Sequence, residues 1–62
     1  MFTEERLLKI GNSMASLYGG SCYEAEYDKE NKIATFYCIE RGEHFCMEET
    51  EEELLKHEKE WC

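Results

Sequence analysis

The stretch of residues 22–47 constrains the fold of this chain more than any other. It contains three runs rich in aromatic and β-branched side chains, separated by two short turn signals. Residues 28–31 (Asp-Lys-Glu-Asn) form the first turn signal and residues 41–42 (Arg-Gly) the second. Short runs of this composition, joined by such turns, are typical of a three-stranded antiparallel meander. We therefore expect strands over residues 21–27, 32–40 and 43–47.

The segment before this meander has the pattern of an amphipathic helix over residues 3–18. Thr3 is a suitable N-cap, and Glu4 and Glu5 complement the positive end of the helix dipole. Apolar residues then recur at helical spacing, with Tyr18 beside the last of them: Leu7, Ile10, Met14 and Leu17. Gly19 stands where a left-handed C-cap residue belongs. Gly11, in the helix interior, either weakens the helix or lets another backbone approach closely.

The segment after the meander predicts a second helix over residues 51–61. Thr50 and Glu53 have the spacing of a capping box, and residues 51–53 are all glutamate. Leu54, Leu55 and Trp61 supply a short apolar stripe that can cover an edge or an open end of the sheet. The fold class we expect is α+β: a single small domain over residues 1–62, with the element order αβββα.

The alternation of side chains along each strand predicts which of them face the helices. On the first two strands, the side chains expected in the core are Tyr23, Ala25, Tyr27, Ile33, Thr35, Tyr37 and Ile39. Those expected on the opposite face are Cys22, Glu24, Glu26, Asp28, Phe36, Cys38 and Glu40. This register has Tyr27 opposite Ile33, across a three-residue loop in which Asn31 takes the left-handed position.

The register of the second hairpin depends on its loop, because a slip of one residue turns every side chain to the other face. A three-residue loop over residues 41–43 places Phe45 and Met47 in the core and His44 and Cys46 on the opposite face. A two-residue loop would reverse this. We prefer the first alternative because it buries Phe45 and Met47.

Cysteine and histidine suggest one kind of chemistry. In the preferred register Cys22, Cys38 and Cys46 form a row across three strands, with His44 diagonal to Cys38, which suggests zinc. The outer two sulfurs of such a row start about 10 Å apart on a flat sheet, too far for one tetrahedral site. A cross-strand disulfide between Cys22 and Cys38 is geometrically feasible under oxidation. The simplest alternative is that the cysteines are reduced and act as small apolar residues.

Charge and size exclude several functions. The chain has 62 residues, with 15 acidic against 7 basic side chains and a net charge of −8. Such a field repels nucleic acid and anionic membranes and attracts basic surfaces. A chain this short has few residues for the walls of a catalytic cleft, so we expect neither an enzyme nor a cofactor. Residues 1–20 lack the pattern of a secretory signal, and we therefore expect a protein of the cytoplasm of a host cell.

The acidic surface is the strongest functional candidate. Glu24, Glu26 and Asp28 alternate along the first strand, so their carboxylates repeat roughly every 6.6 Å, a spacing of the same order as successive phosphates. A second acidic block surrounds the third strand. Aromatic residues, if one or two of them are exposed, could anchor the contact with a basic partner protein. The residues we expect to bind a partner are Glu24, Glu26, Asp28, Glu30, Glu40, Glu43, Glu48, Glu49 and Glu52.

In size, charge and element order the chain resembles the small acidic proteins that phages and mobile elements use as nucleic-acid mimics, including some anti-CRISPR proteins. This resemblance implies an inhibitor that occupies the basic nucleic-acid-binding groove of a protein or nucleoprotein complex. One alternative is a thiol or zinc protein that uses Cys22, Cys38, Cys46 and His44. Another is a structural module that forms homodimers through a strand edge or Trp61.

Overall fold

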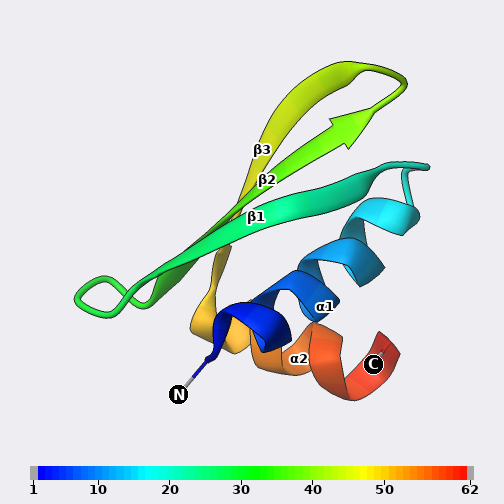
Figure 1. Cartoon of the computed structure of the whole chain (residues 1–62). Coiled ribbons are helices and arrows are strands. Elements are labelled where there is room, and N and C mark those ends of the chain that lie inside the picture. The colour runs from blue at the N-terminus through cyan, green and yellow to red at the C-terminus, as the bar shows by residue number, and fades with distance from the viewer. Residues whose placement is uncertain (1, 62) are drawn as a thin grey trace.

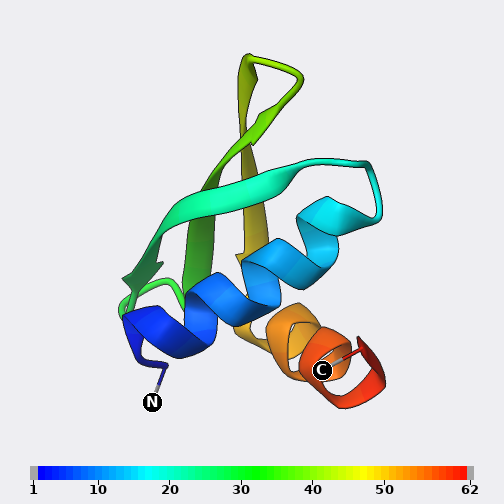
Figure 2. The same ribbon diagram turned by 45° about the vertical axis from the view of Figure 1, so that its right-hand side comes forward.

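The structure is a computed structural model, and it describes residues 2–61. The elements in chain order are α1 (Glu4–Ser16), β1 (Ser21–Asp28), β2 (Ile33–Glu40), β3 (Glu43–Thr50) and α2 (Glu51–Trp61). The strands form one antiparallel sheet in the order β1-β2-β3. Both helices lie on the same side of this sheet (Figures 1 and 2). The predicted αβββα fold is therefore confirmed. No helix in the described part of the chain is long and apolar enough to cross a membrane.

The two ends of α1 follow from local sequence signals. The side chain of Thr3 accepts a hydrogen bond from the backbone N–H of Arg6 at 3.1 Å, as an N-cap does. Gly19 has a φ of 85°, and the next N–H, of Gly20, donates to Ala15 O at 3.0 Å. The helix ends two residues earlier than predicted. Leu17 and Tyr18 therefore leave the expected apolar stripe and are 57% and 67% exposed.

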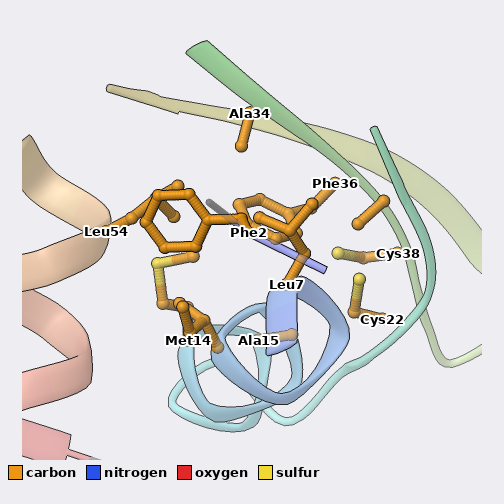
Figure 3. Packing of buried hydrophobic residues seen from close by; sticks show 11 residues of the cluster. Phe2, Leu7, Met14, Ala15, Cys22, Ala34, Phe36, Cys38 and Leu54 are labelled. Atoms are coloured by element: carbon orange, nitrogen blue, oxygen red, sulfur yellow. The ribbon is translucent and has the colours of Figure 1, made fainter. Parts of the chain in front are cut away.

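The core lies between α1 and the inner face of the sheet, the face toward the helices (Figure 3). Phe36 is fully buried at its centre. Gly11 lies directly against it, since a Cβ added at this glycine would be 2.6 Å from Phe36 Cδ1 and 2.9 Å from Cys22 Sγ. Gly11 therefore allows a close approach, as one of its two predicted roles requires, but the approaching atoms belong to side chains of the sheet and not to its backbone.

Strand β2 presents the opposite face to the one predicted. Its inner side chains are Ala34, Phe36 and Cys38, all with no exposed surface, whereas residues 33, 35, 37 and 39 lie on the other face and are half-buried. Both sets are apolar enough to form a core. Because α1 packs so closely at Gly11, the inner face accommodates one large ring flanked by two small side chains.

Strand β1 is interrupted by a β-bulge at Tyr23. Cys22 pairs with Cys38 as predicted, but the next paired residue is Glu24, opposite Tyr37. The extra residue lets Cys22 and Ala25 both face inward, so the prediction was right for Ala25 and wrong for Cys22 and Tyr23.

The first hairpin has a four-residue loop, because Asp28 pairs with Ile33 and Tyr27 with Ala34. Lys32, with a φ of 54°, takes the left-handed position that was predicted for Asn31. The Asp28 carboxylate accepts hydrogen bonds from the backbone N–H groups of Glu30 and Asn31 and from the Asn31 side chain. This Asx-type cap stabilises the longer loop.

The second hairpin has a two-residue loop, and the predicted three-residue loop is wrong. Glu40 pairs with Glu43, and both Arg41 and Gly42 have positive φ values, as a type I′ turn requires. Phe45 and Met47 nevertheless pack against the core, as predicted. The predicted loop is one residue too long, and the predicted inner face of β2 is the wrong one. Each error alone would turn the side chains of β3 to the other face, so the two errors together leave Phe45 and Met47 in the core.

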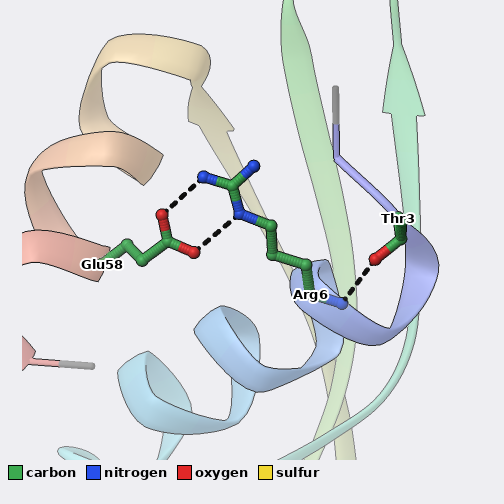
Figure 4. A network of polar contacts seen from close by, with 3 residues as sticks. All are labelled: Thr3, Arg6 and Glu58. Atoms are coloured by element: carbon green, nitrogen blue, oxygen red, sulfur yellow. Dashed lines mark hydrogen bonds and ion pairs between the residues drawn. The ribbon is translucent and has the colours of Figure 1, made fainter.

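Helix α2 begins directly after β3, and Thr50 caps it by accepting a hydrogen bond from the N–H of Glu53 at 3.3 Å. Of its predicted apolar stripe only Leu54 is buried, whereas Leu55 and Trp61 are 47% and 59% exposed. The Arg6 guanidinium donates to both carboxylate oxygens of Glu58 at 2.6 and 2.7 Å and so links the two helices (Figure 4). This contact lowers the pKa of Glu58.

Candidate functional site: the outer face of the sheet

The face of the sheet opposite the helices, here called the outer face, is covered by neither helix (Figures 1 and 2). Strand pairing places its side chains in rows that run across β1, β2 and β3. These rows are Glu24–Tyr37–Cys46, Glu26–Thr35–Glu48 and Asp28–Ile33–Thr50. The outer face therefore has an apolar and aromatic centre on β2 and carboxylates on both flanking strands.

Three of these carboxylates are available to a partner. Glu24, Glu26 and Glu48 are exposed, and none of them forms an ion pair with a basic side chain of residues 2–61. Glu24 and Glu26 lie two residues apart on one strand, and Glu26 and Glu48 are two strands, or about 9.6 Å, apart. They form a triangle of negative charge with no basic partner in the described chain.

Aromatic rings lie among these carboxylates. Tyr37 Oη donates a long hydrogen bond of 3.5 Å to Glu26 Oε2. The Glu26 charge, followed by partial burial, raises the pKa of Tyr37, so its hydroxyl stays protonated and can donate. Tyr23, 53% exposed, contacts His44 with Oη and Nδ1 3.2 Å apart. The outer face thus offers hydrogen-bond donors and ring surfaces as well as negative charge.

Asp28 also lies on the outer face, but its carboxylate is engaged in the first hairpin. Its hydrogen bonds to Asn31, and then to Glu30, lower the pKa of Asp28 and hold it ionised. The turn role predicted for Asp28 is therefore confirmed, and its carboxylate is already bound within the chain.

The other predicted partner-binding residues lie elsewhere. Glu30 is in the first hairpin loop, Glu40 and Glu43 face each other at the end of the second hairpin, and Glu52 is in the first turn of α2. Glu49 lies on the inner face, opposite Ala34. The structure brings Glu24, Glu26, Asp28 and Glu48 together on one face and does not bring the remaining five to it.

The predicted row of cysteines does not exist, because the sheet separates its members. Cys22 and Cys38 are buried on the inner face, whereas Cys46 and His44 are exposed on the outer face. Burial, with the neighbouring Cys22, raises the pKa of the Cys38 thiol to about 12. Among residues 2–61 no three metal-ligating side chains gather at one point. The zinc or thiol site considered from the sequence is therefore not assembled by these four residues.

Sequence reasoning missed the aromatic centre of the outer face, since it placed Tyr37, Ile39 and Tyr23 in the core. The Phe36–Gly11 contact and the bulge at Tyr23, which determine these orientations, leave no signal in the strand pattern itself.

Comparison with known proteins identified no relative: no protein family, no curated protein and no solved structure matches the chain.

Proposed function

We propose that this protein binds a basic partner protein through the outer face of its sheet and occupies a groove in which that partner binds nucleic acid. The observation that carries the proposal is the exposed triangle of Glu24, Glu26 and Glu48 around Tyr37 and Thr35, without basic partners of its own. The −8 net charge would steer it toward a positive groove.

The physical basis is charge complementarity on a stiff support. Carboxylates spaced by roughly 6.6 Å along β1 and about 9.6 Å across the sheet can accept hydrogen bonds from Lys and Arg side chains placed to bind phosphates. The tyrosine hydroxyls and rings supply contacts that do not depend on charge. On size, charge and element order, we place such an inhibitor with the anti-defence proteins of phages and mobile elements, such as anti-CRISPR proteins.

The test compares two triple variants with the same change in net charge. E24Q/E26Q/E48Q neutralises the triangle, whereas E5Q/E52Q/E60Q neutralises three exposed carboxylates away from the outer face. Wild type and both variants are immobilised, and proteins captured from a host lysate are identified by mass spectrometry. The affinity of each purified candidate is then measured by calorimetry at low and high salt.

We expect the outer-face variant to bind the partner at least about tenfold more weakly, since each charged hydrogen bond is worth roughly 1 kcal/mol or more. The affinity of the control variant for the partner should fall less than about threefold, because only the long-range field is weaker. Wild-type protein should also displace nucleic acid from the partner. Equal losses in both variants, or a partner that keeps its nucleic acid when saturated, would contradict the proposal.

A further inference from the structure

A groove lies on the helix side of the sheet, between the C-terminal end of α1, strand β3 and helix α2. Its volume is about 190 Å³, and it is lined by Met14 of α1, Leu17 and Tyr18 just after that helix, Met47 and Glu49 of β3, and Glu53 and His57 of α2. Pockets for small-molecule ligands usually measure roughly 300–1,000 Å³. The groove therefore has the size for one side chain of a partner and not for a separate ligand.

Glu49 is an unusual residue for its position. It lies on the inner face, opposite the fully buried Ala34, and the residues before it on this face of β3 are Met47 and Phe45. Its carboxylate is half-buried and has no hydrogen bond or ion pair with residues 2–61. Partial burial, and then the charge of Glu53, raise its pKa, against a smaller lowering by His57. Glu49 and Glu53 thus both line the groove, and the described residues that line it include no lysine or arginine.

The walls of the groove are apolar and incompletely covered. Tyr18 and Leu17, in the turn that follows α1, are 67% and 57% exposed and so leave apolar surface open at the groove. Met14 and Met47 add flexible thioether side chains, which adapt readily to an inserted group. His57 also lines the groove, and its Nε2 is 3.1 Å from Ser13 Oγ.

Apolar walls that lead to a pair of carboxylates match the chemistry of one kind of side chain. The aliphatic stem of arginine can pack against Met14, Met47 and Leu17, and its planar guanidinium can bind Glu49 and Glu53 while it contacts the ring of Tyr18. Arginine fits better than lysine because its fork of donors can reach two carboxylates at once.

We propose that this groove binds an arginine side chain presented by a partner protein. This site lies on the opposite side of the sheet from the outer face and does not rest on the function proposed for that face. It would give the protein a second point of contact with a basic partner, specific for one residue.

The probe for this site is N-acetyl-arginine amide, with N-acetyl-citrulline amide as its neutral isostere. Each is titrated at millimolar concentration into ¹⁵N-labelled protein with labelled methionine methyl groups, and chemical shifts are followed by NMR. We expect arginine to shift the Met14 and Met47 methyls and the amides of Glu49 and Glu53, and citrulline to bind at least about fivefold more weakly. Equal shifts with the two probes, or arginine shifts confined to Glu24 and Glu26, would overturn the proposal.

Two variants and a matched control complete the experiment. E49Q and E53Q should each weaken arginine binding by about threefold or more, whereas E52Q, in the same turn of α2 but outside the groove, should bind as wild type does. Unchanged binding in E49Q and E53Q would overturn the proposal. So would groove shifts that appear on concentrating the protein without a probe, because a second copy of the chain would then be the occupant.

Discussion

At the scale of single residues, the position of a side chain on the sheet decides its chemistry. Cys38 and Cys46 lie on strands that pair directly with each other, yet Cys38 is fully buried on the inner face and Cys46 is exposed on the outer face. Burial disfavours the thiolate, so the pKa of Cys38 rises to about 12. Because the thiolate is the nucleophile, the two thiols should differ strongly in reactivity.

We therefore predict that iodoacetamide at pH 8 alkylates Cys46 at least about 100-fold faster than Cys38. The raised pKa leaves Cys38 almost fully protonated at this pH, and burial also blocks access. Peptide mass spectrometry of time points measures both rates, with Cys62, which lies outside the described residues, replaced by serine. In concentrated urea the two rates should converge, and similar rates in the native protein would contradict the assigned faces.

At the scale of elements, α2 is attached to the rest of the protein by few contacts. Leu54 is its one buried side chain among the described residues, and the ion pair between Arg6 and Glu58 joins it to α1. The N–H of Glu51 also donates to Lys32 O at 2.9 Å, which ties the start of α2 to the first hairpin. The adjacent Leu55 is 47% exposed and contributes little to this attachment.

The neighbouring leucines provide a matched pair of variants. We predict that Leu54→Ala lowers the free energy of unfolding by about 2–5 kcal/mol, through lost burial and the cavity left behind. Leu55→Ala should lower it by less than about 0.5 kcal/mol. Urea unfolding followed by circular dichroism measures both, and Leu54→Met, which should cost under about 1.5 kcal/mol, serves if the alanine variant does not fold. Equal effects of the two alanine variants would show that α2 docks in another way.

At the scale of the whole molecule, negative charge surrounds the protein with little local compensation. Carboxylates lie on the outer face, at both hairpins, in the groove and along α2, and the only ion pair within residues 2–61 is Arg6–Glu58. With a net charge of −8 on 62 residues, self-repulsion opposes the compact state. The same repulsion opposes close contact between two outer faces of separate copies.

We accordingly predict that the melting temperature rises when NaCl is increased from about 10 mM to about 300 mM, as the Debye length falls from about 30 Å to below 10 Å. Thermal unfolding followed by circular dichroism measures the change. Choline chloride should have the same effect, because the mechanism is general screening and not binding of a specific ion. A melting temperature that is independent of salt would show that the carboxylates do not repel one another appreciably in the folded state.

The candidate site was predictable only in part. The outward orientation of Glu24 and Glu26 was predicted from the alternation of side chains along one strand, which is a short-range property. The structure shows the same orientation. Tyr37, at the centre of the outer face, was predicted in the core, and Glu49 was predicted in the acidic block around the third strand and not in a groove. Their positions depend on which face of β2 meets α1 and on where β3 passes into α2.

The sequence by itself determined the order of the elements and the starts of both helices. Thr3, the Thr50–Glu53 pair and Gly19 act through hydrogen bonds or backbone angles within a few residues, so their effect can be read locally. Only the tertiary structure decided the buried face of β2, since its two alternating sets of side chains are both apolar. The face that carries Phe36 is the buried one, because Gly11 lets α1 approach closely enough to enclose the Phe36 ring. This contact joins residues far apart in the chain.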